Sequence, residues 1–432
     1  MNPVRVIEHK RDGLKHTRGE IQFVVDSATG INHGMKPEQL AAWLMAVVWR
    51  GLDLEETAWL TEAMAKSGDT LDLTGLPKPW VDKHSTGGVG DKTTITLLPM
   101  LAACGLTVVK MSGRGLGKTG GTIDKLASIP GFQTSLTPDQ LKAQALEIGL
   151  ALTGQSYSLT PADGTLYALR DVTGTVPSIP LICASVLSKK IAGGAEVISI
   201  DLKCGSGAFM ETLADARELA RRMKGVGEIL GVKVGVEITD MDQPLGRYAG
   251  NLLEVIEAVD TIHGNGEARF TELCFTLCAS MLVEAGVCAT PTEARVRAEL
   301  CLDDGSAQLK LDQWFAAQGA TVKPSELRSL MTPLSTSEVK SPSDGWVKRI
   351  DAGLVGEAAV DIGAGRRTKE DEVDPQVGIE TCAIVGQEVK AGDVILRVFA
   401  RSDEVANQAA DRLQSALEIS PQVVNPRELI LE

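Results

Sequence analysis

Two glycine-rich loops, separated by one helix and one strand, constrain this chain more than any other feature of its sequence. The first loop covers residues 83–94 (KHSTGGVGDKTT) and the second covers residues 112–122 (SGRGLGKTGGT). Glycine allows the backbone to turn sharply and to approach a ligand closely. Backbone N–H groups in such loops, together with hydroxyls and an ammonium, form a cradle for phosphate. One loop alone is a weak signal, because a tight turn uses the same residues, but two together favour a phosphate site.

The segment between the loops predicts how they are arranged. Residues 94–104 have the character of a helix, which Asp91 can cap and Gly105 can end, although Pro99 predicts a kink. Residues 106–111 are apolar and β-branched, as in a short strand. This order places both loops at one edge of a parallel sheet, where α/β proteins bind ligands. The first loop lacks the Gly-x-x-x-x-Gly-Lys-Ser/Thr pattern of ordinary ATPases, which argues against that class.

Length, charge and cysteine usage narrow the class of protein and its partners. The 432 residues predict two or three domains. The net charge of −14 disfavours nucleic acid and anionic membranes as partners, whereas the basic residues of the glycine loops suit a small anionic substrate. The chain has no apolar run of about 18 residues and no apolar signal core after Met1, so we expect no membrane span. Its eight cysteines are scattered without a Cys-x-x-Cys pair, which predicts reduced thiols and a cytoplasmic protein.

Periodicity along the rest of the chain indicates an α/β fold with a helical N-terminal part. The helix predicted at residues 37–49 is apolar nearly all round, which fits either contact with another subunit or deep burial within one chain. Helices and strands alternate from the first loop to about residue 317. From residue 340, short strands with Gly and Pro turns indicate an α+β end module, closed by a helix at 404–419. The module is similar to a lipoyl-type sandwich without a carrier lysine, so we interpret it as structural.

Several blocks of the sequence resemble one family. The second loop, continued to Asp124 and Leu126, resembles the signature of the thymidine and pyrimidine-nucleoside phosphorylases. The segment 83–91 is similar to the phosphate loop of these enzymes. Further family blocks are found at Tyr167-Ala168-Leu169-Arg170-Asp171, at Ser185-x-x-Ser188-Lys189-Lys190, and from Asp201 to Met210. Together these motifs are highly specific, and the resemblance spans nearly the whole chain.

The resemblance implies a fold and a division into domains. It implies a helical lobe formed by residues 1–68 and 161–194, which binds the base and dimerises. It implies a large α/β lobe with a mixed sheet, formed by residues 69–160 and 195–335, which binds phosphate. The C-terminal α+β module then covers residues 340–432. The implied assembly is a homodimer through the helical lobe.

The resemblance also implies an activity, the reversible phosphorolysis of pyrimidine nucleosides in cytoplasmic nucleoside salvage. Phosphate attacks C1′ of uridine, thymidine or deoxyuridine and releases the free base and (deoxy)ribose 1-phosphate. Inorganic phosphate is then the co-substrate, and no cofactor is expected. The residues implied to bind phosphate are Lys83, Ser85, Thr94, Ser112 and Thr122.

The base is implied to be bound by Arg170, Ser185 and Lys189. Ser185 and Lys189 are four residues apart in a predicted helix, so they share one face, which suits a binding surface or a solvent-facing stripe. Negative charge develops on the base as the glycosidic bond breaks, and the two cations stabilise it there. His84, beside Lys83, can protonate the base. We therefore expect His84, Arg170 and Lys189 to be the catalytic residues.

Some positions depart from the family pattern. Lys118 stands where His is common, Ala127 stands where Glu ends the signature, and Thr94 replaces a frequent Ser. Some relatives bind a monovalent cation, and the corresponding residues in this chain are Gly90, Lys92, Leu245, Tyr248 and Glu257. The ammonium of Lys92 has no lone pair with which to bind a cation. We therefore expect Lys92 to occupy the position itself, to pair with Glu257, and to exclude potassium, so that no metal is bound.

Lys110 bears on the choice of sugar. It lies two residues before Ser112 on the predicted strand, so both side chains point to the same side. An ammonium can donate to the 2′-hydroxyl that distinguishes ribose from deoxyribose, which predicts a broad enzyme. In the family, thymidine-restricted members tend to carry Met at this position. The alternative for Lys110 is that it points to solvent or only helps to hold phosphate.

Other functions are compatible with parts of this pattern. The alternatives are a thymidine-restricted phosphorylase and a phosphoribosyltransferase of the same fold. The latter needs a site for pyrophosphate and magnesium, and no acidic cluster follows the glycine loops. A non-catalytic binding protein is disfavoured because His84, Arg170 and Lys189 are all present.

Overall fold

The computed structural model describes residues 1–31, 34–115, 120–155, 158–332, 334–368 and 371–432. Its contacts divide the chain into two compact units. Unit 1 comprises Met1–Asp82, Gln155–Ile198 and Arg217–Val236, and unit 2 comprises Lys83–Gly154, Ser199–Ala216 and Glu237–Glu432. Among the described residues, we find no helix with the length and apolar character needed to cross a membrane.

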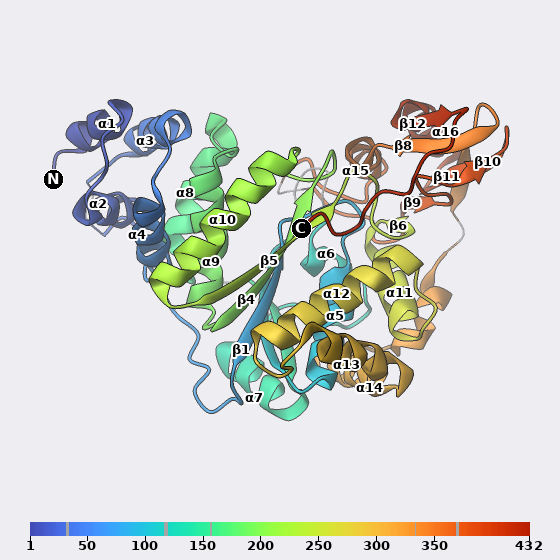
Figure 1. Cartoon of the computed structure of the whole chain (residues 1–432), viewed down its shortest axis with the longest axis horizontal. Coiled ribbons are helices and arrows are strands. Elements are labelled where there is room, and N and C mark those ends of the chain that lie inside the picture. The colour runs from blue at the N-terminus through green and yellow to red at the C-terminus, as the bar shows by residue number, and fades with distance from the viewer. Residues whose placement is uncertain (32–33, 116–119, 156–157, 333, 369–370) are drawn as a thin grey trace. The chain divides into compact units, whose positions relative to one another are not determined.

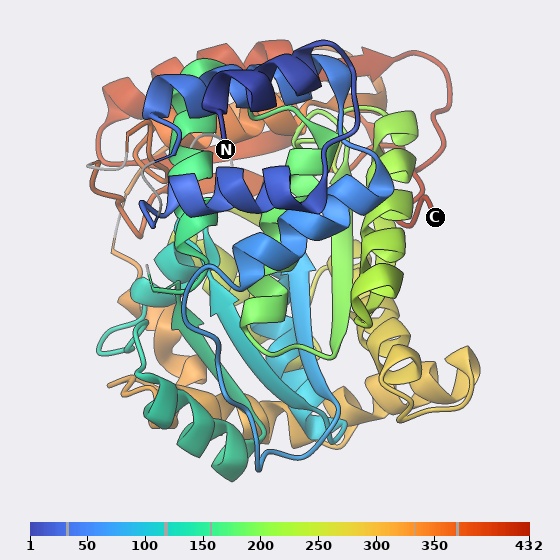
Figure 2. The ribbon, with the colours of Figure 1, turned by 90° about the vertical axis from the view of Figure 1, so that its left-hand side faces the viewer.

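Unit 1 is built from helices, and Figure 2 shows the first four of them packed together in blue. The helices are α1 (Pro3–Arg11), α2 (Arg18–Ala28), α3 (Pro37–Arg50), α4 (Leu54–Ala65), α8 (Pro161–Thr173), α9 (Ile179–Ala192) and α10 (Leu213–Leu230), the last beginning in unit 2. Capping boxes start α2 and α4, at Thr17 and Asp53. The core of the bundle includes Trp43, Leu44 and Leu60, which are 0% exposed. Periodic apolar faces therefore form this bundle as the sequence predicts.

The longest segments of unit 1 that the resemblance places in the α/β lobe are residues 69–82 and 217–236. Helix α10 contacts the start of α4, where the guanidinium of Arg222 donates to the carbonyl of Leu52 at 2.5 Å and to Thr57 Oγ1 at 3.0 Å. These contacts join residues far apart in the chain, so no local pattern predicts them. The domain boundaries derived from the sequence stay a prediction.

A five-stranded sheet carries the glycine loops, with the strand order β3-β2-β1-β4-β5. The strands are β1 (Trp80–Ser85), β2 (Thr107–Ser112), β3 (Leu150–Gly154), β4 (Val197–Cys204) and β5 (Lys233–Asp240). β2 and β3 pair in parallel, with Val108 opposite Leu150. The boundary between the units passes through β1, β4 and β5. The short apolar strand β3 was not expected from the sequence, because five residues directly after a helix carry too little periodicity.

Helices of unit 2 surround α5 (Thr93–Ala103), which connects β1 to β2 (Figure 1). Helices α12 and α14 pack against α5. Lys92, rather than the expected Asp91, occupies the N-cap position, but the Asp91 carboxylate still accepts from the Thr93 N–H at 3.1 Å. The other helices here are α6 (Thr122–Ala127), α7 (Pro138–Ile148), α11 (Asn251–Ile262), α12 (Ala268–Glu284), α13 (Pro291–Asp303) and α14 (Ser306–Ala317).

The C-terminal part of unit 2 is an α+β module. Its sheets have the orders β6-β9-β11-β7 and β10-β8-β12, with most strands paired antiparallel. The elements are β6 (Tyr248–Ala249), η1 (Pro324–Leu330), β7 (Ser335–Lys340), β8 (Gly345–Ile350), α15 (Ala352–Asp361), β9 (Gly378–Thr381), β10 (Glu388–Val389), β11 (Val394–Ala400), α16 (Asp403–Leu413), η2 (Gln414–Ala416) and β12 (Leu417–Ser420). The closing helix was predicted to reach residue 419, but it ends earlier because β12 pairs with β8. The predicted combination of helical lobe, α/β lobe and α+β module is confirmed.

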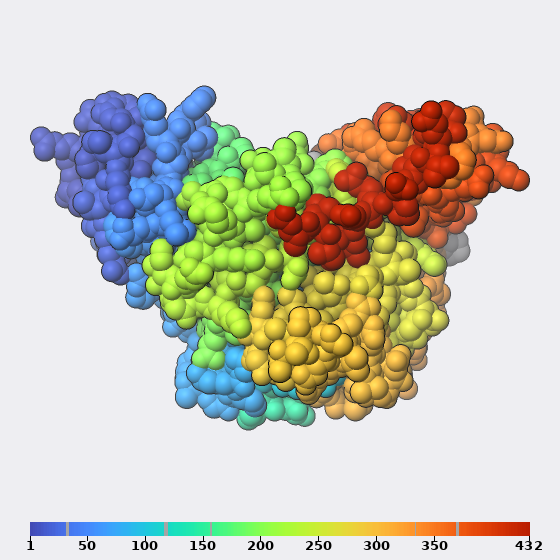
Figure 3. All heavy atoms as spheres, in the orientation of Figure 1, coloured from blue at the N-terminus to red at the C-terminus, as the bar shows by residue number. Residues whose placement is uncertain are grey.

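The chain ends by pairing with the α/β sheet. The N–H of Asp240 in β5 donates to the carbonyl of Leu429 at 2.9 Å, and the N–H of Ile238 donates to that of Glu432 at 2.7 Å. Figure 3 shows this tail as a red band that extends from the C-terminal module over green residues. The last residues therefore tie the C-terminal module back to the α/β sheet within unit 2.

Candidate active site

The two glycine loops meet at one edge of the sheet. β1 ends at Ser85 and its neighbour β2 ends at Ser112, and α5 crosses over between them as in a parallel pair. The Lys125 ammonium, in the helix after the second loop, donates to the carbonyl of Asp91 in the first loop at 2.6 Å. The predicted placement of both loops at one edge is therefore confirmed. Residues 116–119 of the second loop, Lys118 among them, lie outside the described residues.

Buried ion pairs join the start of the first loop to strand β4. The Lys83 ammonium is fully buried, contacts Thr93 Oγ1, and lies 3.3 Å from Asp201. Lys203 lies 2.8 Å from the same carboxylate. Asp201 also accepts from Thr239 Oγ1 at 2.7 Å. Lys83, expected to face phosphate, is thus anchored to an acidic residue of β4.

Asp91 lies at the centre of the first loop and holds two hydroxyls. It accepts from Ser85 Oγ and, at 2.7 Å, from Thr93 Oγ1. Burial alone would raise the pKa of Asp91, but the charges of Lys83, Lys203 and Lys125, with the Ser85 hydroxyl, hold this pKa well below its usual range. Asp91 therefore stays ionised and fixes the path of the loop.

Lys92 takes the position expected of it from the sequence. Its ammonium lies 2.6 Å from Glu257 and donates to the carbonyls of Leu245 at 2.7 Å and Tyr248 at 3.2 Å. The ring centroid of Phe270 is 5.1 Å away. The predicted pair with Glu257 is confirmed. Gly90 packs against the same loop, because a Cβ at this position would lie only 2.6 Å from the carbonyl oxygen of Leu245. A positive charge built into the chain thus holds the loop from 245 to 248.

The side chain of Asp124, in the helix after the second loop, holds the first part of that loop through hydrogen bonds. Its carboxylate accepts from the Gly115 N–H at 2.7 Å and from Arg114 at 3.2 Å. A Cβ on Gly121 would lie 2.1 Å from the Gly115 nitrogen, so only glycine allows the two ends of the loop to approach this closely. We call this close approach of Gly115 and Gly121 the neck of the second loop. Ser112 and Thr122, the predicted phosphate residues of this loop, lie on either side of the neck and are both half-buried.

Lys110 is buried beside the first loop, with only 3% of its surface exposed. Its ammonium contacts the carbonyl of Lys83, at the residue before His84. Lys110 does not point to solvent, so one of the two alternatives that the sequence left open is excluded. Whether it reads the sugar stays a prediction.

The predicted base-binding residues all lie in unit 1, on α8 and α9. The Lys189 ammonium lies 2.6 Å from Asp163 and 3.0 Å from Ser185 Oγ. Arg170 is 3% exposed, and its guanidinium donates to the carbonyls of Thr175, Val176 and Leu181. Burial lowers the pKa of Arg170, while the charge of Asp163 opposes that shift. The sequence brings Ser185 and Lys189 together as predicted.

The structure thus gathers two groups of candidate residues, one in each unit. Unit 2 holds the predicted phosphate residues with His84 and Lys110, and unit 1 holds the predicted base residues. His84, Ser85, Ser112 and Thr122 are half-buried, whereas Thr94 is 6% exposed.

Sequence reasoning missed the acidic partners of these groups. Asp163 lies 26 residues from Lys189 and Asp201 lies 118 residues from Lys83, distances at which no spacing rule applies. One signal was present, because Asp201 and Lys203 alternate on a strand and therefore share a face. A second was the Asp91 carboxyl, which directly follows Gly90 in the first glycine-rich loop.

One group of described residues has metal-ligand spacing, formed by His9, His16 and Glu20. The Trp43 indole N–H donates to His16 Nε2 at 2.9 Å, which leaves the proton of a neutral imidazole on Nδ1. Burial lowers the pKa of His16 to about 4, so the ring stays neutral. A protonated Nδ1 cannot bind a metal, so His16 is a core residue held by Trp43, while His9 lies nearer the surface, 2.9 Å from Glu20.

Comparisons with known proteins agree with this architecture. Family models match in three segments: "Glycosyl transferase family, helical bundle domain" at residues 4–68, "Glycosyl transferase family, a/b domain" at residues 77–308, and "Pyrimidine nucleoside phosphorylase C-terminal domain" at residues 346–420. Among solved structures, the anthranilate phosphoribosyltransferase of Thermus thermophilus is similar, with a TM-score of 0.59 at 19% identity over 72% of this chain and 99% of that one. That likeness shows the fold alone.

Relatives of similar length narrow the class further. The pyrimidine-nucleoside phosphorylase of Geobacillus stearothermophilus is 45% identical over 100% of this chain and 99% of its own. That of Staphylococcus haemolyticus is 44% identical over 99% and 98%. The first two family models define a glycosyl transferase with a helical bundle and an α/β domain. The third model and these identities are more specific, and the chain belongs to the pyrimidine-nucleoside phosphorylase family.

Proposed function

We propose that this chain catalyses the reversible phosphorolysis of pyrimidine nucleosides. The observation that carries the proposal is the 45% identity over the whole chain with a relative named pyrimidine-nucleoside phosphorylase. In this reaction a phosphate oxygen bonds to C1′ of the pentose while the bond from C1′ to the base breaks. The electron pair of that bond leaves with the base, which takes up a proton. The products are the free base and pentose 1-phosphate.

We assign phosphate binding to the loop residues Lys83, Ser85, Thr94, Ser112 and Thr122. The assignment is supported by the meeting of the two loops at one sheet edge. An ammonium has three protons, and among the described residues Thr93 and Asp201 take two of those on Lys83. We assign the third to a phosphate oxygen and the hydroxyls of Thr94, Ser112 and Thr122 to the others, and Ser85 joins them when its proton turns from Asp91 to phosphate.

We assign the base to Arg170, Ser185 and Lys189, with His84 as the acid that protonates the leaving base. The Arg170 guanidinium is positioned by three backbone carbonyls, which neutralise its charge less than a paired carboxylate does. Asp163 fixes the Lys189 ammonium on the same face of unit 1. Cations placed where negative charge develops lower the barrier to breaking the glycosidic bond.

We further propose broad sugar specificity, read by Lys110, so that uridine, thymidine and deoxyuridine are all substrates. The buried ammonium at the Lys83 carbonyl supports a place beside the phosphate loop. A thymidine-restricted phosphorylase is the alternative. Acceptance of thymidine with rejection of uridine would select it.

The test of the function is base release from uridine and thymidine, with and without inorganic phosphate and without any added cofactor. We expect release only with phosphate, together with formation of pentose 1-phosphate. Lys66→Ala serves as a matched control, because this lysine lies in unit 1 on the surface and pairs with Glu62. An equal rate of release without phosphate would identify a hydrolase and refute the proposal.

We also propose that the protein is a cytoplasmic homodimer assembled through the helical lobe. Helix α3 buries Trp43 and Leu44, but leaves Trp49 79% exposed and Met45 38% exposed. Met45 and Trp49 are four residues apart and so share one face of the helix, and neighbouring exposed apolar side chains mark interaction sites. Light scattering should give twice the chain mass, and Trp49→Glu should shift the population toward monomer, whereas a monomeric wild-type protein would refute the assembly.

A further inference from the structure

The C-terminal module reaches the second glycine loop through one buried contact. Arg366, in the segment after α15, lies 2.7 Å from Asp124 and is 11% exposed at its side chain. Asp124 is 5% exposed at its side chain and is the residue that closes the neck of the second loop. Both residues belong to unit 2.

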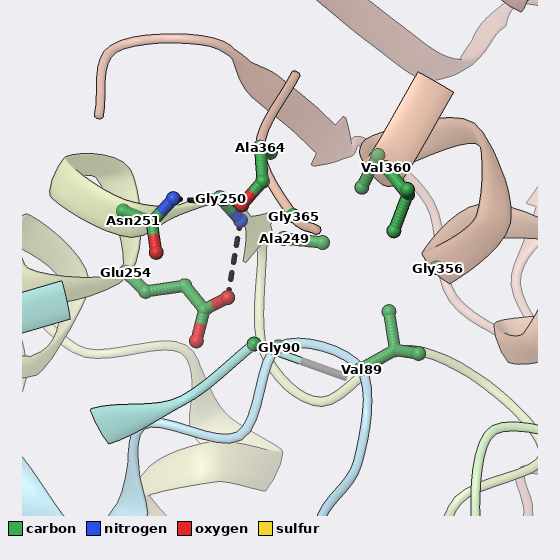
Figure 4. Close-up of a pocket in the computed structure, with 12 residues that line it drawn as sticks. Val89, Gly90, Ala249, Gly250, Asn251, Glu254, Gly356, Val360, Ala364 and Gly365 are labelled. Carbon is green, nitrogen blue, oxygen red and sulfur yellow. Dashed lines mark hydrogen bonds between the residues drawn. The ribbon is translucent and has the colours of Figure 1, made fainter. Parts of the chain in front are cut away.

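The segment that carries Arg366 is hydrogen-bonded to the α/β part of unit 2 and to itself. Asn251, at the start of α11, donates from its side chain to the carbonyl of Ala364 at 2.8 Å. The Arg366 Nε donates to the carbonyl of Asp371 at 2.9 Å. Figure 4 shows Ala364 and Gly365 facing Gly90 of the first loop across a small cleft, which Gly120 also lines.

Arg366 neutralises the buried charge of Asp124. A buried carboxylate needs a buried partner, because the cost of removing it from water is recovered only by pairing and hydrogen bonds. The other arginine on Asp124 is Arg114, whose side chain is 60% exposed and whose distance is 3.2 Å. Arg366 is therefore the better shielded of the two cations on Asp124.

We propose that Arg366 is a positioning residue for phosphate binding, acting through Asp124 on the neck of the second glycine loop. Asp124 links the Gly115 backbone to α6, and so it sets the separation of Ser112 and Thr122 on either side of the neck. Arg366 orients that carboxylate from the C-terminal module. The inference rests on the proposed function, in which Ser112 and Thr122 bind phosphate.

The test compares Arg366→Ala with Arg367→Ala as a matched control. Arg367 is the next residue, but its side chain is 71% exposed and pairs with Asp361. We expect Arg366→Ala to raise the KM for phosphate about tenfold, a typical cost for loosening a charged hydrogen bond, with an unchanged KM for the nucleoside. Arg367→Ala should leave both constants unchanged, and Arg366→Lys should restore part of the phosphate KM.

A double variant distinguishes a positioning role of Arg366 from a role in the stability of the fold. In an Asp124→Asn protein, Arg366→Ala should have no further effect on the phosphate KM, because its route of action is already removed. The proposal is overturned if Arg366→Ala behaves like Arg367→Ala. It is also overturned if its effect persists in the Asp124→Asn protein, or if both KM values and the Tm change together.

Binding of inorganic phosphate alone distinguishes failure of this inference from failure of the proposed function. Phosphate should raise the Tm of the wild-type protein without nucleoside, and Arg366→Ala should lose most of that rise. A wild type that shows the rise but does not cleave nucleosides would refute the function and leave the inference standing. A wild type that shows no rise would overturn the inference.

Discussion

Arg170 in unit 1 and the buried lysines beneath the first glycine loop in unit 2 are held in different ways. Beneath the first glycine loop, in unit 2, ammonium groups meet carboxylates, with Lys92 2.6 Å from Glu257 and Lys125 2.6 Å from Glu254. In unit 1, Arg170 is as deeply buried, but its guanidinium donates to three backbone carbonyls.

The difference separates charges that build the site from charges that act in it. A lysine paired with a carboxylate is nearly neutral to its surroundings and holds backbone in place. An arginine held by carbonyl dipoles is neutralised less than a paired lysine, although the charge of Asp163 also acts on Arg170. Lys189 lies between the two cases, because it pairs with Asp163 yet keeps 21% of its side chain exposed. We therefore expect substitution of a lysine paired with a carboxylate to lower stability, and substitution of a cation available to the substrate to lower the rate of catalysis.

The largest expected effect is on stability, from Lys92→Ala. The change leaves Glu257 charged and buried, which costs about 3–5 kcal/mol. Urea unfolding should show this loss, whereas Lys348→Ala, in an exposed pair with Glu418, should cost less than about 1 kcal/mol. Combining Lys92→Met with Glu257→Gln removes both charges and should recover part of the loss. Equal effects of Lys92→Ala and Lys348→Ala would abolish the distinction between the two kinds of cation.

The next effect is on catalysis, from Arg170→Ala and Lys189→Ala. Each should lower kcat/KM by about 10² or more, the usual loss when a charge partner of the transition state is removed. Steady-state kinetics with thymidine and saturating phosphate measure it, with Lys66→Ala as the surface control. Near-normal kinetics in both variants would show that unit 1 does not supply the acting charges.

A smaller effect concerns the choice of sugar, and it decides whether Lys110 is a structural lysine or a cation that contacts the substrate. Lys110→Met should lower the efficiency for uridine relative to thymidine by about 1–3 kcal/mol, because the 2′-hydroxyl loses its donor. The ratio of kcat/KM for the two nucleosides before and after the change measures this. An unmoved ratio would place Lys110 with the structural lysines, as support for the Lys83 carbonyl.

The smallest expected effect is none, on exchanging potassium for a large organic cation. The Lys92 ammonium already lies against Glu257 and the carbonyls of Leu245 and Tyr248, so the wild type should keep its activity and its Tm. Lys92→Ala, which empties that position, should become sensitive to potassium. Loss of wild-type activity in the organic cation would contradict the role given to Lys92.

Much of the fold follows from local signals in the sequence. Apolar character and capping residues located α3, α5 and β2 within a residue or two. Strand β3 and the end of α16 were missed, since pairing with distant strands decided them. The family blocks pointed to the candidate residues of both units.

The sequence by itself determined the family, because the motif blocks that carry the resemblance are runs of neighbouring residues. One confirmed long-range prediction, Lys92 with Glu257, combined the family's cation position with the chemistry of an ammonium. Only the tertiary structure decided which carboxylate neutralises which cation, as with Asp201 for Lys83, 118 residues away. Buried charges must find partners wherever the fold brings them, and that geometry has no local signature. The contact of Arg366 with Asp124 is of the same kind, and it gives the C-terminal module its place in the proposed phosphate site.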